Sequence, residues 1–160
     1  MASGYDGPYP LGESSMYKNI ILAYDGSKTG QQALLESKEL AQWGRASVWL
    51  VAVMPSPVNL AGYDGSVYIP EIAERDTQHF QDILADGLMR MKDAGFQVQG
   101  ELLTGETVHE ISGFARRVKA DLIVVGHRHL DNWAARWWRG STSAALVEHS
   151  PCSVLCVINN

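Results

Sequence analysis

Small residues near the end of the chain have the types and the order that suit phosphate binding. Gly126 follows the apolar run Leu122–Val125, and we expect the backbone to turn at this glycine. Gly140-Ser141-Thr142-Ser143 stands directly before a further group of apolar residues. Hydroxyl residues in such a place are typical of a helix N-terminus. Free backbone N–H groups and the positive end of the helix dipole attract anions there, and glycine lets a phosphate come close to the backbone. The pattern predicts a phosphate cradle that closes at this helix start.

The distribution of charge supports an anionic ligand in this part of the chain. The whole chain has a formal net charge of −5 and a pI near 5.5. Between residues 122 and 147, however, the basic residues Arg128, Arg136 and Arg139 outnumber a single acidic residue, Asp131. Basic residues beside a candidate anion site favour negative ligands. The alternative is that these arginines are solvated or pair with helix carboxylates.

Asp25 is the second candidate for ligand chemistry. It follows the apolar run Asn19–Tyr24 and precedes Gly26-Ser27, which predicts a strand that ends in a turn. A carboxylate at the carboxyl end of a buried strand in an open α/β sheet points toward the crevice where such folds bind ligands. An equally good interpretation is that Asp25 caps the helix that follows, and the two roles are compatible.

The elements that must position these residues are predicted to alternate between strands and helices. Apolar, β-branched runs of strand length recur, and segments with an apolar period near 3.6 separate them. The alternation predicts an α/β fold, in which a parallel sheet has helices on both faces and right-handed crossovers. The expected strands are Asn19–Tyr24, Ser47–Met54, Val98–Leu103, Leu122–Val125 and Ser153–Ile158, and the expected helices are Lys28–Trp43, Glu71–Ala94, residues 108–118 and the segment after Gly140-Ser141.

Length and composition fit one domain. A chain of 160 residues, 46% hydrophobic and 19% charged, can bury a core without disulfides or metal ions. Residues 1–15 hold three glycines and two prolines and show no strand or helix period. We therefore expect a flexible N-terminal extension at residues 1–15 and a single α/β domain at residues 16–160.

Several of these motifs together resemble the universal stress protein family. They are Ile20–Ser27, Gly126, Gly140-Ser141 and Pro151–Leu155, and the similarity runs from about residue 17 to residue 158. The resemblance implies a five-stranded, doubly wound parallel sheet with a ligand crevice between the first and fourth strands. It also implies that the ligand is an adenine nucleotide, ATP or AMP, with Mg²⁺ left open as a companion ion.

The same resemblance assigns roles to individual residues. It places Asp25 beside the nucleoside, Val53 against the adenine ring, and the phosphates on the loop from Gly126 to Gly140-Ser141-Thr142. In the nucleotide-binding branch of the family this loop has the pattern G-x2-G-x9-G-[ST]. Here His129 stands at the second glycine, and ten residues separate it from Gly140. The sequence from Gly126 to His129 instead resembles the branch of the family that does not bind ATP.

His129 predicts that nucleotide binding is weakened and not abolished. If this position requires a positive φ, histidine adds a backbone cost of about 1–2 kcal/mol, which is roughly a factor of ten in affinity. We therefore expect ATP or AMP to bind at micromolar affinity or poorer, in a way that depends on Gly140 and Ser141. The alternative is a protein-interaction module of the same fold that binds no nucleotide.

Other site chemistries have weaker support. His127, His129 and Asp131 could bind zinc, but no second cluster supplies a fourth ligand, so we interpret them as loop residues and expect no bound metal. Ser141 does not lie in the G-x-S-x-G pattern of a nucleophile elbow. No pair of carboxylates indicates general acid–base catalysis. We therefore expect a stress-response binding protein that is not an enzyme, or is at most a very slow ATPase.

Composition also bounds the partners and the location of the protein. The acidic balance disfavours nucleic acid, and no apolar run approaches the roughly 18 residues that span a membrane. Cys152 and Cys156 would lie roughly 13 Å apart on one strand, too far to form a disulfide with each other. No signal-peptide pattern precedes them, so we expect reduced thiols and a cytoplasmic location.

The last predicted strand bears on assembly. Ser153–Ile158 is apolar and close to the end of the chain, and we expect it at an edge of the sheet, where it can pair with another strand. The family resemblance implies dimerisation through this strand. We therefore expect a homodimer.

Overall fold

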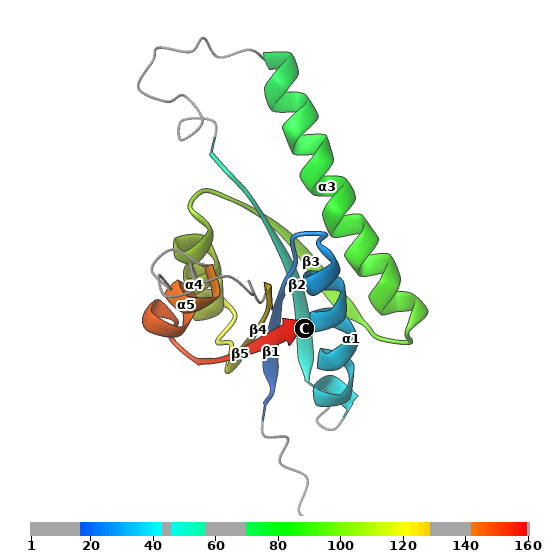
Figure 1. Ribbon diagram of the computed structural model, residues 1–160, viewed down its shortest axis with the longest axis vertical. Helices are drawn as coiled ribbons and strands as arrows, with labels where there is room; N and C mark the ends of the chain where they lie inside the picture. Colours follow the sequence, from blue (N-terminus) through cyan, green and yellow to red (C-terminus); the bar gives the residue numbers. More distant parts are fainter. Residues whose placement is uncertain (1–16, 43–45, 57–69, 129–141, 160) are drawn as a thin grey trace, which may run out of the picture.

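The computed structural model describes residues 17–42, 46–56, 70–128 and 142–159, and the counts of helices and strands refer to these residues. They form five strands and four helices that alternate along the chain (Figure 1). Each element predicted from the sequence is present, with small shifts at its ends and the largest shift at β4. The elements are β1 (Asn19–Ala23), α1 (Lys28–Gln42), β2 (Ser47–Met54), α3 (Pro70–Asp93), β3 (Val98–Thr104), α4 (Thr107–Arg117), β4 (Leu122–Arg128), α5 (Thr142–His149) and β5 (Ser153–Asn159).

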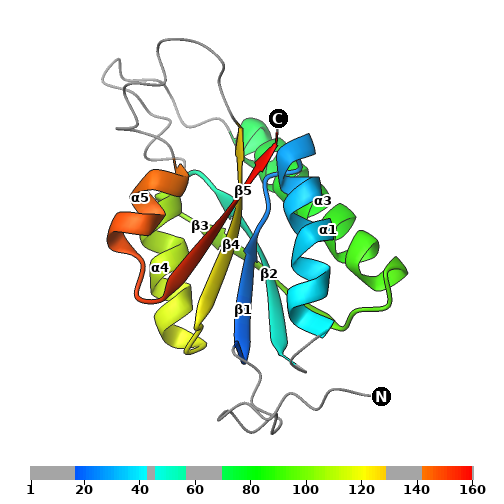
Figure 2. The ribbon, with the colours of Figure 1, turned by 60° about the horizontal axis from the view of Figure 1, so that its bottom comes forward.

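The five strands form one parallel sheet in the order β3-β2-β1-β4-β5. α1 and α3 cover one face of this sheet, and α4 and α5 cover the other (Figures 1 and 2). Because both faces are covered, the central strands can be continuously apolar. Ile20, Ile21 and Ile123 accordingly have none of their surface exposed. The predicted doubly wound α/β fold with a single domain is therefore confirmed.

Side chains of the central strands alternate between two separate apolar cores. On the side of α1 and α3, Ile20 of β1 packs with Val124 of β4. On the side of α4 and α5, Ile21 and Ile123 pack with Leu146 of α5. The alternation follows from the period of two in a strand. Burial of each such side chain contributes about 1.5–3 kcal/mol, so the central strands contribute strongly to stability.

The order of the strands reverses direction at β1. The chain passes from β1 to β2 and β3 on one side and later forms β4 and β5 on the other. Ala23, at the end of β1, is paired with Val51 of β2 and with Val125 of β4. Open parallel sheets bind ligands outside the carboxyl ends of their strands at such a reversal. The predicted position of the reversal, between the first and fourth strands, is confirmed.

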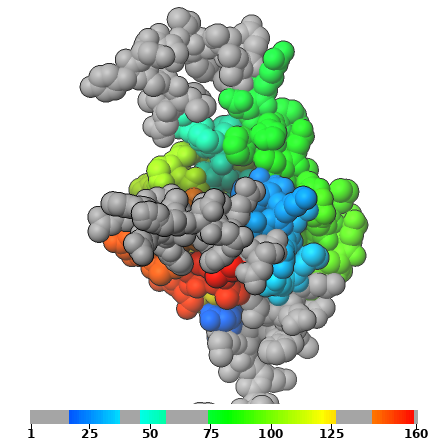
Figure 3. Space-filling view, viewed as in Figure 1, coloured from blue at the N-terminus to red at the C-terminus, as the bar shows by residue number. Residues whose placement is uncertain are grey.

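The long helix α3 approaches the sheet closely at Gly87. A Cβ atom there would stand 2.6 Å from Leu50 Cδ2 and 2.7 Å from Tyr24 Cδ1, which is closer than such atoms can pack. The missing side chain therefore lets α3 lie directly on Leu50 and Tyr24, which are both buried. α1 lies beside α3, and the two helices form a continuous surface (Figure 3).

A polar network fixes α3 to the end of β1. Tyr24 Oη donates a hydrogen bond of 2.6 Å to Asp86 Oδ2, and Arg90 Nε donates one of 2.8 Å to the same oxygen. Burial and the hydrogen bond to Asp86 raise the pKa of Tyr24 to about 12. The hydrogen bonds from Arg90 and Tyr24 lower the pKa of Asp86. Around neutral pH the network therefore joins a neutral phenol to a charged carboxylate.

We predict that Gly87→Ala lowers the free energy of unfolding and that Gly113→Ala raises it. In a helix interior, alanine is more favourable than glycine by about 1 kcal/mol. Nothing lies within 4 Å of a Cβ placed on Gly113 in α4, so this gain is expected there. At Gly87 the methyl group overlaps two buried side chains, and overpacking of this kind costs about 1–3 kcal/mol. Urea denaturation compares the two variants, and equal stabilities would contradict the close approach of α3.

Candidate ligand-binding cavity

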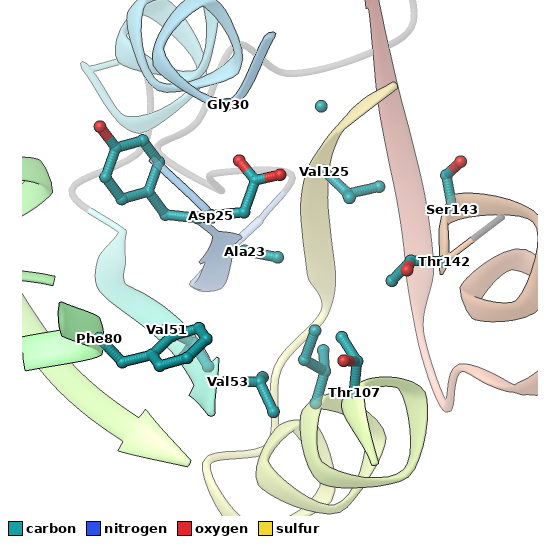
Figure 4. Close-up of a pocket in the computed structure, with 13 residues that line it drawn as sticks. Ala23, Asp25, Gly30, Val51, Val53, Phe80, Thr107, Val125, Thr142 and Ser143 are labelled. Carbon is teal, nitrogen blue, oxygen red and sulfur yellow. The ribbon is translucent and has the colours of Figure 1, made fainter. Parts of the chain in front are cut away.

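A cavity of about 300 Å³ opens at the carboxyl edge of the sheet (Figure 4). It lies over the reversal of strand order, because residues at the ends of β1, β2 and β4 line it. Helices from both faces of the sheet complete its walls. The lining residues are Ala23, Tyr24, Asp25, Gly30, Val51, Val53, Phe80, Thr107, Ile111, Val125, Gly126, Thr142 and Ser143.

Three helices begin at this cavity. Gly30 lies in the first turn of α1, Thr107 is the first residue of α4, and Thr142 and Ser143 are the first residues of α5. In a parallel sheet the end of each strand leads to a helix that starts at the same edge. Helix N-termini carry the positive ends of the helix dipoles. The topology therefore brings several positive helix ends to one cavity.

Acidic side chains distinguish these helix starts. At α4 the Glu106 carboxylate accepts hydrogen bonds from the backbone N–H groups of His109 (2.7 Å) and Val108 (3.1 Å), and both bonds lower the pKa of Glu106. Asp25 lies close to the start of α1, whereas the first turn of α5 holds no acidic residue. A carboxylate already occupies the positive end of α4 and another stands near that of α1. An anionic ligand group is therefore favoured most at the start of α5.

Asp25 connects the turn after β1 with the cavity. Its Oδ1 accepts a hydrogen bond of 2.9 Å from Ser27 N, and Ser27 Oγ accepts one of 3.0 Å from Gly30 N. The cap of α1 is therefore Ser27, and Asp25 holds the turn before it. The carboxylate lies over Gly30, where a Cβ atom would stand 2.7 Å from Oδ1. Asp25 is exposed and lines the cavity, so a ligand can reach its carboxylate as well (Figure 4).

Gly126 has a packing role that differs from its predicted role. We predicted a turn at this glycine, but β4 continues through it to Arg128, and Gly126 pairs with Val157 of β5. A Cβ atom at Gly126 would stand 2.8 Å from both the carbonyl carbon and the carbonyl oxygen of Thr29, in the first turn of α1. The prediction of a turn was therefore wrong. Glycine is needed here because β4 passes directly against the backbone of α1.

The lining of the cavity has an apolar part and a polar part. Val53 from β2, Phe80 from α3 and Ile111 from α4 supply apolar surface. Ser143 of α5 lies on the other side of the cavity from Phe80 in the view of Figure 4, and Asp25 lies between β1 and α1. Ligand sites commonly combine apolar walls with a few polar groups that fix orientation. This arrangement suits a ligand with a flat, weakly polar body and an anionic group.

Predicted site residues from distant parts of the chain line the cavity together. Asp25, Val53, Gly126 and Thr142 all line it. They meet because each lies near or just beyond the carboxyl end of a strand, or at the start of a helix, on one edge of the sheet. The strand order explains why Asp25 and Gly126, about a hundred residues apart in sequence, lie at neighbouring strands.

Other predicted site residues lie outside the part of the chain that the structure describes. They are His129, Asp131, Arg136, Arg139, Gly140 and Ser141. The side chains of His127 and Arg128 are also outside it, although their backbone belongs to β4. Of the residues predicted for the phosphate loop, the structure therefore describes the two ends, Gly126 and Thr142.

Some cavity residues were not predicted from the sequence. Thr107 lies at the start of α4, and the preference for hydroxyl residues at helix starts could have indicated it. Ile111 follows Thr107 by one turn on the same helix. Phe80 has no comparable signal, since it lies within α3 and its position depends on how that helix packs on the sheet.

The described residues also bear on metal, thiol and membrane chemistry. Within residues 17–42, 46–56, 70–128 and 142–159, no three His, Cys, Asp or Glu side chains are grouped so that they could hold a metal ion. Cys152 and Cys156 are free and half-buried, and burial raises the pKa of both thiols. None of the four described helices is long and apolar enough to cross a membrane.

Comparison with known proteins identifies relatives over almost the whole domain. The model of the universal stress protein family matches residues 16–157. A protein of Staphylococcus epidermidis that is classed with the universal stress proteins is 35% identical over 144 residues, which cover 88% of this chain and 84% of that protein.

Solved structures share the fold. A protein of the universal stress protein family from Burkholderia pseudomallei is 27% identical, with a TM-score of 0.69, and the match covers 90% of this chain and 98% of that one. A universal stress protein solved in complex with cAMP is 24% identical, with a TM-score of 0.65 and the same coverage of 90% and 98%.

Proposed function

The chain belongs to the universal stress protein family, and on this basis we propose that it binds an adenine nucleotide, ATP or AMP, in the cavity at the carboxyl edge of the sheet. The observation that carries the proposal is the chemical division of this cavity. One side offers the start of α5, which has no acidic residue in its first turn, and the other offers apolar side chains. A nucleotide has the matching parts, namely a phosphate and a flat base.

The charges favour one orientation of the nucleotide. The phosphate lies at Thr142 and Ser143, because helix N-termini bind phosphates and the carboxylates of Asp25 and Glu106 repel them elsewhere. The nucleoside lies between Asp25 and Val53. The Asp25 carboxylate accepts a hydrogen bond from a ribose hydroxyl, and Val53 contacts the base.

Nucleotides bound to proteins of the same fold support this proposal. Besides the structure with cAMP, a universal stress protein from Arabidopsis thaliana was solved with AMP and one from Archaeoglobus fulgidus with dAMP. These two chains are 18% and 22% identical to this one, and likeness at that level establishes the fold alone. Their ligands are adenine nucleotides in each case.

We further propose that the protein binds the nucleotide as a signal in the stress response and does not turn it over, or hydrolyses ATP very slowly. Asp25 is the one carboxylate among the described lining residues, and these include no histidine, lysine or arginine. One carboxylate that also holds a turn is a poor basis for general acid–base catalysis. Mg²⁺ is a candidate companion of the phosphates of ATP. The two free thiols fit the reducing cytoplasm, where we place the protein.

We predict that AMP and ATP bind at micromolar affinity or poorer and that Thr142→Glu selectively weakens binding. Two like charges about 4 Å apart repel by roughly 1–4 kcal/mol, so the glutamate should lower the affinity for AMP by about fivefold or more. Uncharged adenosine should bind the variant and the wild type equally. The helix should tolerate the change because Thr142 is exposed and acidic residues suit a helix N-terminus. Isothermal titration calorimetry measures all three ligands.

Ser47→Glu is the matched control for the Thr142→Glu variant. Ser47 is exposed at the start of β2, at the opposite end of the sheet from the cavity, so the same added charge should leave AMP binding unchanged. Absence of heat from the wild type at millimolar AMP and ATP would contradict the proposal. That result would favour the alternative, a protein-interaction module of the same fold without a nucleotide.

We also propose that the protein forms a homodimer through β5. This strand is at an edge of the sheet, where its outer backbone groups are available for pairing. Leu155 and Ile158 of this strand are 38% and 50% exposed, which is unusual for large apolar side chains. Val157, by contrast, is 4% exposed and belongs to the core, so a charge there would test folding and not assembly.

We predict that light scattering gives about twice the chain mass of 17.6 kDa and that Ile158→Lys reduces it to the mass of one chain. The lysine places a charge in the proposed interface without entering the core. Leu35→Lys is the control, because Leu35 is 65% exposed on the side of α1 that faces Arg90 and Met91 of α3. A wild-type mass of one chain at micromolar concentration would contradict the dimer.

A further inference from the structure

One face of α3 leads from the apolar core to the cavity. Met91 is buried in the core, and Gly87, one turn earlier, lies against the sheet. Ile83, another turn earlier, reaches the turn after β1, where a Cβ atom on Gly26 would stand 3.3 Å from Ile83 Cγ1. Phe80 is next on the same face, since residues three and four apart in a helix share a face. Its side chain lines the cavity.

Phe80 therefore lies where the sheet has ended and the cavity begins. In Figure 4 Val53 lies between Phe80 and Thr107 of α4. α3 and α4 cover opposite faces of the sheet (Figure 2). Phe80 and Thr107 thus form two walls of the cavity beyond the end of β2. Of these two residues, Phe80 supplies an aromatic ring.

The charges of the cavity indicate what this ring contacts. The favoured position for a phosphate is at the start of α5, and Phe80 lies across the cavity from it. The part of a nucleotide farthest from its phosphate is the base. Bases stack on aromatic side chains, and a purine offers a larger face for stacking than a pyrimidine.

We infer that Phe80 stacks on the nucleotide base and is a determinant of the preference for purines over pyrimidines. The inference rests on the proposed function, which places a nucleotide in this cavity. It adds a specificity-determining residue from α3 to a site that sequence motifs locate at the strand ends and the phosphate loop.

The helix that carries Phe80 is held on the sheet before any ligand binds. Close packing at Gly87 and the hydrogen bond from Tyr24 to Asp86 fix the C-terminal half of α3 to the sheet. Phe80 lies two turns from this anchor on a continuous helix. Little freedom is lost when a base stacks on a wall that is already ordered, which favours binding.

Calorimetry with AMP, CMP and ribose 5-phosphate tests the inference, because the three ligands share a ribose phosphate and differ in the base. The wild type should bind AMP more tightly than CMP, and CMP more tightly than ribose 5-phosphate. Phe80→Leu should weaken AMP binding by about fivefold or more, the lower end of the effect of losing one stacked base. It should weaken CMP less and leave ribose 5-phosphate unchanged, whereas Phe80→Tyr should keep the affinity for AMP.

Phe96→Leu is the matched control. Phe96 is also partly buried, but it lies just after α3 at the opposite end of the sheet, beside Val98, so its loss should not change AMP binding. Equal affinity of the wild type for AMP and CMP would overturn the inference. This comparison uses the wild type alone and therefore does not depend on whether a variant folds. Unchanged AMP binding by Phe80→Leu would also overturn it while leaving the proposed function intact. A wild type that binds none of the three ligands would overturn the proposed function itself.

Discussion

Because all five strands run in parallel, the carboxyl ends of the strands and the starts of the following helices lie at one edge of the sheet. This constraint gathers the positive ends of several helices around a single cavity. Acidic residues then make these helix starts unequal. Glu106 occupies the start of α4 and Asp25 stands near that of α1, which leaves the start of α5 as the favoured position for an anion. The electrostatics of the site therefore follow from topology and from two carboxylates.

Close approaches at two glycines connect the core with this cavity. Gly126 lets β4 pass against the first turn of α1, and Gly87 lets α3 lie on Tyr24 and Leu50. Tyr24 belongs to both regions, since its ring is part of the apolar core and also lines the cavity. Changes that separate a helix from the sheet should therefore alter stability and ligand binding together.

The sequence predicted the fold well because buried parallel strands are distinct apolar runs, and those runs alternate with helical periods. It also predicted that Asp25, Val53, Gly126 and Thr142 belong to one site. Gly126 lines the cavity but lies within β4 and not at a turn, because a glycine that allows close packing and a glycine that turns the chain look alike in a sequence. The sequence did not predict that Phe80 lines the cavity, since contacts at other residues set the angle and depth at which α3 packs on the sheet.

The central claim is that an adenine nucleotide occupies the cavity at the carboxyl edge of the sheet. NMR spectroscopy of ¹⁵N-labelled protein titrated with AMP tests it most directly, because it reports contact residue by residue. The account predicts shifts of the amide signals of Asp25, Val53, Gly126 and Thr142, while the amide of Phe96, at the opposite end of the sheet, stays unchanged. A spectrum that does not change at millimolar AMP, or that changes only along β5, would contradict it.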